Sequence, residues 1–103
     1  MGAKATQSAA AIAIVVNFSG AVPEWEEIAA TACAVQNMWL AATSIGLGGY
    51  WASPGLINHI GPFLKLEENQ RCIGLFYIGK PKEVEKREAV RSPLEDKIRW
   101  ENA

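Results

Sequence analysis

Two segments of this chain are apolar apart from a single asparagine, Asn17, and they constrain its fold more than any other feature. Residues 11–18 and residues 72–78 are rich in branched and aromatic side chains and end at Ser19-Gly20 and Gly79-Lys80-Pro81. A strand with one face in water alternates apolar and polar residues, so continuous runs predict strands buried on both faces. Such a sheet needs helices on both of its sides.

A long helix is expected between these two strands. Pro23 suits a first helical turn, and Glu24, Glu26 and Glu27 place negative charge at the positive end of the helix dipole. The helix should end at Gly46, because glycine readily adopts the left-handed conformation that follows a helix. An apolar face at spacings of three and four comprises Trp25, Ile28, Ala29, Ala32, Val35, Trp39, Ala42 and Ile45. Small residues occupy much of the rest, so we expect this helix to be covered on most sides.

Shorter elements are expected in the remainder of the chain. Tyr50 and Trp51 suit a short strand, and residues 56–65 suit a short helix. That short helix would turn Leu56, Ile60, Phe63 and Leu64 inward. Residues 92–95 read Ser-Pro-Leu-Glu, a capping-box pattern that predicts a short terminal helix through Ile98.

The charge pattern and these elements divide the chain into three parts. Residues 1–10 are expected to be a flexible N-terminal segment, residues 11–81 a partial domain, and residues 82–103 a charged linker with a C-terminal arm. One long and one short helix cannot cover both faces of the sheet, and a two-stranded sheet is marginal alone. The surplus apolar surface must be buried against a missing portion of the same domain, another copy of the chain, or both.

Composition excludes several classes of function. The 103 residues carry a net charge of −1, which gives no basic surface for nucleic acid or an anionic membrane. No apolar run approaches the length of about 20 residues that spans a bilayer. Cys33 and Cys72 lie in apolar runs without metal-ligand spacing, so we expect two buried free thiols, no metal site and a cytoplasmic protein.

No constellation of catalytic side chains is evident. His59 is the only histidine and has no partner that defines a site, so a structural role is expected. The glutamates suit helix starts and solvated loops. Residues 46–55, Gly-Leu-Gly-Gly-Tyr-Trp-Ala-Ser-Pro-Gly, are interpreted either as a helix stop and turn or as backbone that a flat ligand can approach closely.

An ordered series of motifs gives this chain a resemblance to a known family. The series begins with the strand at 11–18, Val-Pro-Glu-Trp-Glu at 22–26, Ala-Cys-Ala-Val-Gln-Asn-Met at 32–38 and Leu-Ala-Ala at 40–42. It continues with Gly-Leu-Gly-Gly-Tyr-Trp-Ala-Ser at 46–53, Ile-Gly-Leu-Phe-Tyr-Ile-Gly-Lys-Pro at 73–81 and Arg-Ser-Pro-Leu-Glu-Asp-Lys at 91–97. Together they resemble the C-terminal half of the nitroreductase family of FMN-dependent oxidoreductases.

The resemblance implies a fold, a cofactor and a reaction. The implied fold is α+β, a partial three-layer nitroreductase-like fold with a central sheet and a long dimer-interface helix, assembled as an intertwined homodimer or higher homo-oligomer. It implies FMN bound between subunits and hydride transfer from NADH or NADPH through the flavin to a nitro compound, a quinone or a similar small acceptor. The implied flavin ring contacts are Trp51, Ala52 and Ser53 with the adjoining Pro54 and Gly55, and Arg91 approaches the FMN phosphate.

The resemblance also implies that part of the flavin site lies outside these motifs. The family's N-terminal portion, with its Arg-Arg-Ser-type phosphate motif, has no counterpart in this sequence, and Ala52 stands where some relatives have a basic residue. We therefore expect either an oxidoreductase, complete or in truncated form, or a non-catalytic oligomerisation or ligand-binding module that lacks a complete flavin site. A visible absorption spectrum separates the two.

Overall fold

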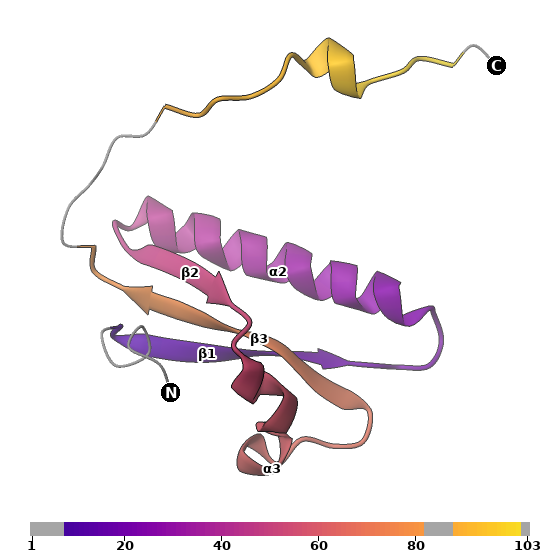
Figure 1. Ribbon diagram of the computed structural model, residues 1–103, viewed down its shortest axis with the longest axis vertical. Coiled ribbons are helices and arrows are strands. Elements are labelled where there is room, and N and C mark those ends of the chain that lie inside the picture. Colours follow the sequence, from indigo (N-terminus) through magenta and orange to yellow (C-terminus); the bar gives the residue numbers. More distant parts are fainter. Residues whose placement is uncertain (1–7, 82–87, 102–103) are drawn as a thin grey trace.

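The computed structural model describes residues 8–81 and 88–101. In chain order the elements are β1 (Ala10–Asn17), α2 (Glu24–Ser44), β2 (Gly48–Ala52), the 3-10 helix η1 (Gly55–His59), α3 (Gly61–Leu64), β3 (Gln70–Gly79) and the 3-10 helix η2 (Leu94–Lys97). Figure 1 shows one helix running along a small sheet, with a separate C-terminal segment beyond it. The two strands, the long helix and the short strand at Tyr50 and Trp51 are confirmed within one or two residues.

The sheet has three antiparallel strands in the order β1-β3-β2. β3 is central, with Ile12 opposite Phe76 on one side and Trp51 opposite Phe76 on the other. The β1–β3 register shifts by one residue, because Ile14 pairs with Gly74 whereas Val15 pairs with Cys72. β1 and β2 are thus the two edges of the sheet among the described residues.

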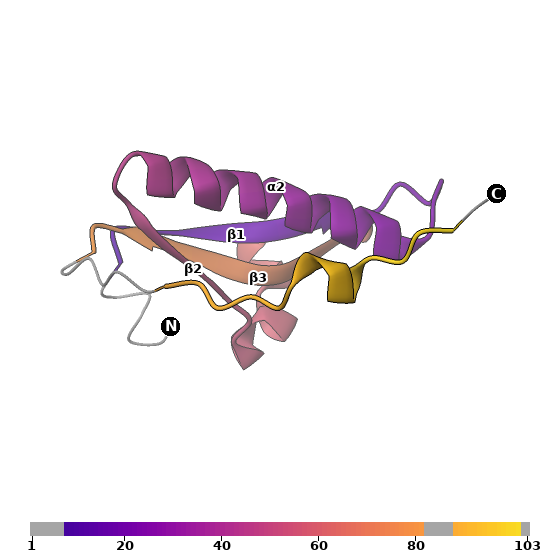
Figure 2. The same cartoon turned by 90° about the horizontal axis from the view of Figure 1, so that it is seen from above.

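Helices lie on both faces of the sheet, but unequally. Figure 2 shows α2 along one face and the η1–α3 segment below the other. α2 packs against β1 and β2, whereas η1 packs against β3. Ile12, an inward position of β1, is still 38% exposed. The expectation of strands buried on both faces is therefore met only in part by this single chain.

The limits of α2 follow from the residues at its ends. Pro23 is its N-cap, with no side-chain cap, and the carboxylate of Glu27 instead accepts hydrogen bonds from the Ser19 hydroxyl (2.6 Å) and the Ser19 amide (3.0 Å). These bonds fix the loop that enters the helix. At the other end Gly46 adopts φ +82°, and the Gly46 amide donates to the Thr43 carbonyl. Helix termination at Gly46 is confirmed.

The core lies between α2 and the sheet. Ile14, Val35 and Phe76 form its centre, and Phe76 is 0% exposed. The ring of Trp39 meets that of Phe76 edge to face, with centroids 5.4 Å apart and planes at 74°. Partly buried residues that pack against this centre are Met38, Trp39, Trp51, Ile73 and Ile78.

Several expectations about individual side chains are wrong. Trp25 and Ile45, at the two ends of the expected apolar face, are 67% and 74% exposed, because the core that α2 covers is centred on Val35 in the middle of the helix. Cys33 is exposed because it faces away from the sheet, whereas Cys72 is buried as expected. Phe63 points outward and is 81% exposed, since residues 55–64 form a 3-10 turn and one α-helical turn instead of a continuous helix.

The C-terminal segment, residues 88–101, extends away from the rest of the chain. Every residue in it is exposed, including Val90, Leu94 and Trp100. The expected capping box does not form, because η2 begins after Pro93 without a side-chain cap. The radius of gyration is 17.2 Å, where a compact domain of this length has about 13 Å. The chain therefore leaves much apolar surface uncovered, as its sequence indicates.

The burial of Phe76 generates a stability prediction. Phe76→Ala removes the wholly buried ring and should lower the free energy of unfolding by about 3–5 kcal/mol, through lost transfer energy and a cavity. Phe63→Ala makes the same chemical change at an exposed side chain and should stay within about 0.5 kcal/mol of the unmodified chain. Urea unfolding followed by tryptophan fluorescence measures both, and equal losses in the two variants would contradict the assigned core.

Candidate functional site

The ring-binding residues that the sequence predicts lie together where the chain leaves the sheet. Trp51 and Ala52 are the last two residues of β2, Ser53 and Pro54 form a connection, and Gly55 is the first residue of η1. In Figure 1 this stretch bends from the end of β2 toward the η1–α3 segment.

The side chains of Trp51 and Ala52 lie on opposite faces of the sheet. Trp51 pairs with Phe76 and packs against the core under α2. Ala52 pairs with Leu75, and its single methyl adds little bulk on the other face. The indole of Trp51 therefore helps to hold the strand in place, and the half-buried Ala52 presents no large side chain to a ligand.

Ser53, Pro54 and Gly55 form an extended, sterically open stretch of backbone. The Ser53 hydroxyl donates to the Ile73 carbonyl at 3.3 Å, and Pro54 has extended dihedral angles of −65° and 156°. No heavy atom lies within 4 Å of the position that a Cβ on Gly55 would occupy. As the first residue of a helix, Gly55 has an amide N–H without an intrahelical acceptor. This stretch can accept a planar ring and donate a hydrogen bond to a ring heteroatom.

Arg91, the predicted phosphate ligand, is not brought to this stretch. It lies in residues 88–101, where it is exposed. In the described part of the chain no hydrogen bond or ion pair joins Arg91 to residues 51–55.

The lack of charged residues in the sequence around 51–55 limits which part of a ligand these residues can bind. No Lys, Arg, Asp or Glu occurs anywhere from Ile28 to Leu64. An uncharged isoalloxazine-like ring fits such a surface, whereas a phosphate needs cationic donors. The residues at 51–55 thus fit the ring portion of a flavin, and the phosphate requires a cation from elsewhere, of which Arg91 is the candidate in this chain.

The other chemically capable residues do not form a site. His59 ends η1 and is exposed, and Glu24, Glu26 and Glu27 lie in the first turn of α2. Among residues 8–81 and 88–101, no three His, Cys, Asp or Glu residues are grouped so that they could hold a metal ion. Across the same ranges, no helix has the length and apolar character needed to cross a bilayer.

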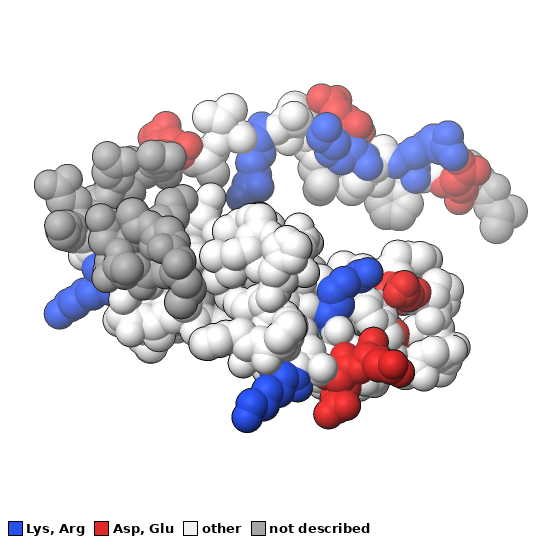
Figure 3. All heavy atoms as spheres, turned by 60° about the horizontal axis from the view of Figure 1, so that its bottom comes forward, with Lys and Arg blue, Asp and Glu red and all other residues white. Residues whose placement is uncertain are grey.

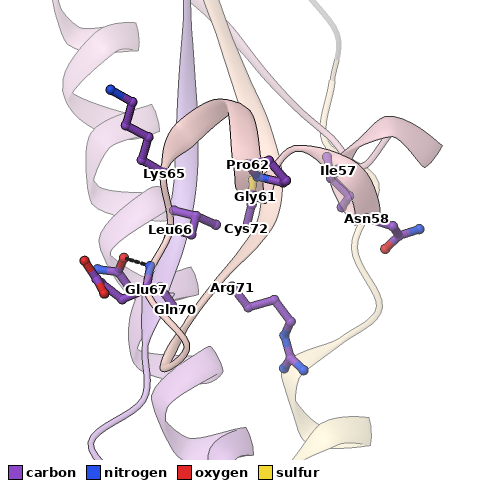
Figure 4. Close-up of a pocket in the computed structure, with 10 residues that line it drawn as sticks. All are labelled: Ile57, Asn58, Gly61, Pro62, Lys65, Leu66, Glu67, Gln70, Arg71 and Cys72. Carbon is purple, nitrogen blue, oxygen red and sulfur yellow. Dashed lines mark hydrogen bonds between the residues drawn. The ribbon is translucent and has the colours of Figure 1, made fainter.

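A hollow of about 460 Å³ lies beside the η1–α3 segment (Figure 4), and none of residues 51–55 lines it. Its lining is Ile57, Asn58, Gly61, Pro62, Lys65, Leu66, Glu67, Gln70, Arg71 and Cys72. The two cations do not converge: Lys65 and Arg71 point away from each other in Figure 4, and the Arg71 guanidinium lies 4.9 Å from the centre of the Phe18 ring. The hollow therefore offers no concentrated charge to a ligand.

Sequence reasoning missed one feature beside the open stretch. Gly74 and Ile73 on β3 face the end of β2, and Ile73 is the extra residue of the register shift. The signal was present as a glycine inside an otherwise apolar strand, which often marks a bulge or a close approach of another group.

Solved structures resemble this chain over most of its length. A nitroreductase-like family protein from Bacillus cereus matches with a TM-score of 0.72 and 29% identity, covering 89% of this chain and 50% of that one. A putative NADH dehydrogenase/NAD(P)H nitroreductase from Bacteroides thetaiotaomicron matches with a TM-score of 0.68 and 26% identity, covering 92% and 56%. The chain thus spans about half the length of these solved relatives.

Sequence comparison gives the family directly. No curated protein matches the chain. The model of the nitroreductase family matches residues 2–80, which is most of the chain and includes all three strands, α2 and the open stretch at 51–55. The resemblance of the sequence motifs and the mixed fold are both confirmed, and the chain belongs to the nitroreductase family.

Proposed function

We propose that this chain forms part of an FMN-dependent oxidoreductase that passes hydride from NADH or NADPH through the flavin to a nitro compound or a quinone. The observation that carries the proposal is the family match across residues 2–80, which includes the uncharged, open stretch at 51–55. The name of one solved relative, an NAD(P)H nitroreductase, supports the same class of reaction.

The residues of this chain would bind and orient the flavin. The backbone from Ala52 to Gly55 would lie against the ring, with the Gly55 amide as a donor to a ring heteroatom. The flavin, when bound, supplies the hydride chemistry. The chain's own part is to hold the ring flat and to keep bulky side chains away from it, which the methyl of Ala52 and the missing side chain of Gly55 allow.

A homodimer is part of the proposal, because the chain cannot cover its own surface. Apart from the glutamates of its first turn, α2 presents an uncharged outer side that includes Ala30, Cys33, Ala34 and Ala41, all exposed. Residues 88–101 add exposed Val90, Leu94 and Trp100. Figure 3 shows that the middle of another face is also free of charge. A large, apolar interface with a second copy would bury such surfaces.

A cytoplasmic location is also proposed. Cys33 and Cys72 are both free, and one of them is exposed. Free thiols persist in the reducing cytosol, whereas oxidising compartments favour disulfides.

One observation favours a second candidate function, a non-catalytic ligand-binding or oligomerisation module. No Lys or Arg occurs in the sequence from residue 28 to residue 64, and of the phosphate contacts that the family resemblance implies this sequence supplies Arg91. Such a module would form the dimer but would not bind a flavin.

Absorption spectroscopy tests the two candidates. We expect the purified full chain, incubated with FMN and passed through a desalting column, to retain flavin absorption that bleaches when NADH or NADPH is added. A chain that emerges colourless and shows no quenching of FMN fluorescence supports the module and excludes flavin chemistry for this chain alone.

Replacing Arg91 tests the phosphate contact. Arg91→Ala should weaken FMN binding about tenfold or more, because a charge-assisted hydrogen bond contributes about 1.5–3 kcal/mol. Binding of riboflavin, which lacks the phosphate, should hardly change. Arg99→Ala is the matched control, since Arg99 is on the same arm and pairs with Glu101. Fluorescence titration of the unmodified chain and both variants with FMN and with riboflavin gives the six affinities, and a similar loss for riboflavin or in Arg99→Ala would contradict the assignment.

A charge on the outer side of α2 tests the dimer. We expect the full chain to sediment as a dimer at micromolar concentration and Ala34→Glu to sediment as a monomer, because the substitution buries an unpaired carboxylate in the interface. Asn58→Glu adds the same charge at an exposed position of η1 and should leave the dimer intact. A monomeric full chain, or a dimeric Ala34→Glu, would overturn the assembly proposed here.

A further inference from the structure

Two aromatic side chains and two glycines interlock at the β2–β3 pair, on the face covered by α2. Trp51 and Phe76 stand directly opposite each other. A Cβ on Gly49 would lie 2.4 Å from the Phe76 ring, and a Cβ on Gly74 would lie 2.1 Å from Nε1 of Trp51. Each ring thus leans over the glycine diagonally across the strand pair, and the two rings lean in opposite directions. Neither glycine has a left-handed φ, so each is needed for space and not for its conformational freedom.

The two glycines differ in what surrounds them. All three atoms nearest to a Cβ on Gly49 belong to the Phe76 ring. A Cβ on Gly74 would also lie 2.9 Å from the backbone carbonyl oxygen of Ala52. We call the space above Gly74, filled by the Trp51 indole and bounded by Ala52, the Gly74 notch. A side chain on Gly74 would displace the backbone of β2 as well as the Trp51 indole. A side chain on Gly49 would displace only the Phe76 ring.

The Gly74 notch lies next to the residue that tethers the open stretch. Ile73 has no counterpart on β1, because Ile14 pairs with Gly74 and Val15 with Cys72. A bulge leaves its extra residue outside the ladder, and here the Ile73 carbonyl accepts the hydrogen bond from the Ser53 hydroxyl. β2 stops pairing at Ala52, one residue before this bond. The notch and the bulge together set the point and direction at which residues 53–55 leave the sheet.

We propose that Gly74, with the Trp51 indole seated over it, is a positioning residue that fixes the Ser53–Gly55 backbone for ring binding. Gly74 does not touch the ring; it acts through the Ala52 carbonyl and the adjoining Ile73–Ser53 bond. The first half, that the notch sets the backbone at 53–55, stands on the contacts alone. The second half, that this setting governs flavin affinity, rests on the proposed function.

The test compares three variants of the full chain by ¹H–¹⁵N NMR, which reports backbone position without any flavin. Gly74→Ala places a methyl group where the Trp51 indole lies, whereas Trp51→Leu removes most of the indole and creates no clash. The second variant therefore provides a folded sample even if the first fails to fold. Both should shift the amide signals of Ser53, Gly55 and Leu56 and speed their hydrogen exchange. Gly49→Ala, the matched control, should perturb signals near Phe76 and leave those three amides in place.

A double variant and a flavin titration complete the test. Adding Trp51→Leu to Gly74→Ala removes the ring contacts and should return the three amide signals part of the way, since the Ala52 carbonyl remains close. FMN should bind to Gly74→Ala about tenfold more weakly than to the unmodified chain, because small displacements of a binding group are costly. Gly49→Ala should bind FMN as the unmodified chain does.

The outcomes separate the two proposals. Amides at 53–56 that stay in place in both Gly74→Ala and Trp51→Leu, or that move equally in Gly49→Ala, overturn the positioning role. Amides that move in a Gly74→Ala chain of unchanged FMN affinity overturn the link to the flavin and leave the proposed function standing. An unmodified chain that binds no FMN, together with the expected amide shifts, overturns the proposed function and supports the role of the notch in placing the backbone.

Discussion

The contact on which the structure depends is the burial of Phe76 between α2 and the sheet. Its ring is closed off completely, with Trp39 of α2 at its edge and Gly49 of β2 leaving space beside it. One side chain of the central strand therefore joins the helix to β2, the strand that carries the open stretch. Because the helix covers this face and only η1 and α3 approach the other, the molecule has one well-packed layer boundary and one that is largely unfinished.

The regular elements could be predicted because each has a local cause. Apolar runs predicted β1 and β3. The ends of α2 were predicted within about two residues from Pro23, three glutamates and Gly46. The burial of single residues could not be predicted in the same way. Trp25 and Phe63 were placed on periodic apolar faces and Cys33 in an apolar run, yet all three are exposed, because which side of a helix meets the sheet depends on how the strands are ordered and packed. Neither is encoded in a local spacing.

The candidate site shows the same division. Composition singled out residues 46–55, the family motif alone pointed to residues 51–55 within them, and the structure shows how these residues leave the sheet. Arg91 was found from the motif alone, and the structure does not bring it to residues 51–55, because the placement of an exposed side chain in residues 88–101 has no local cause in the sequence. Gly74 and the extra residue Ile73 were missed because a bulge is a property of two strands in register, visible only when β1 and β3 are aligned. The glycine within the apolar strand was the trace that it left in the sequence.

Among the described residues β1 is an edge of the sheet, because it pairs with β3 on one side and with no other strand. The eight residues of β1, Ala10–Asn17, include no proline and no charged residue, which are the residues that discourage another strand from joining an edge. A newly made chain with such a border is prone to lateral association with any extended peptide at hand. Pairing of that border with a further strand, from another portion of the domain or from a second copy, removes this hazard, so the order in which the parts come together matters as well as how tightly they bind.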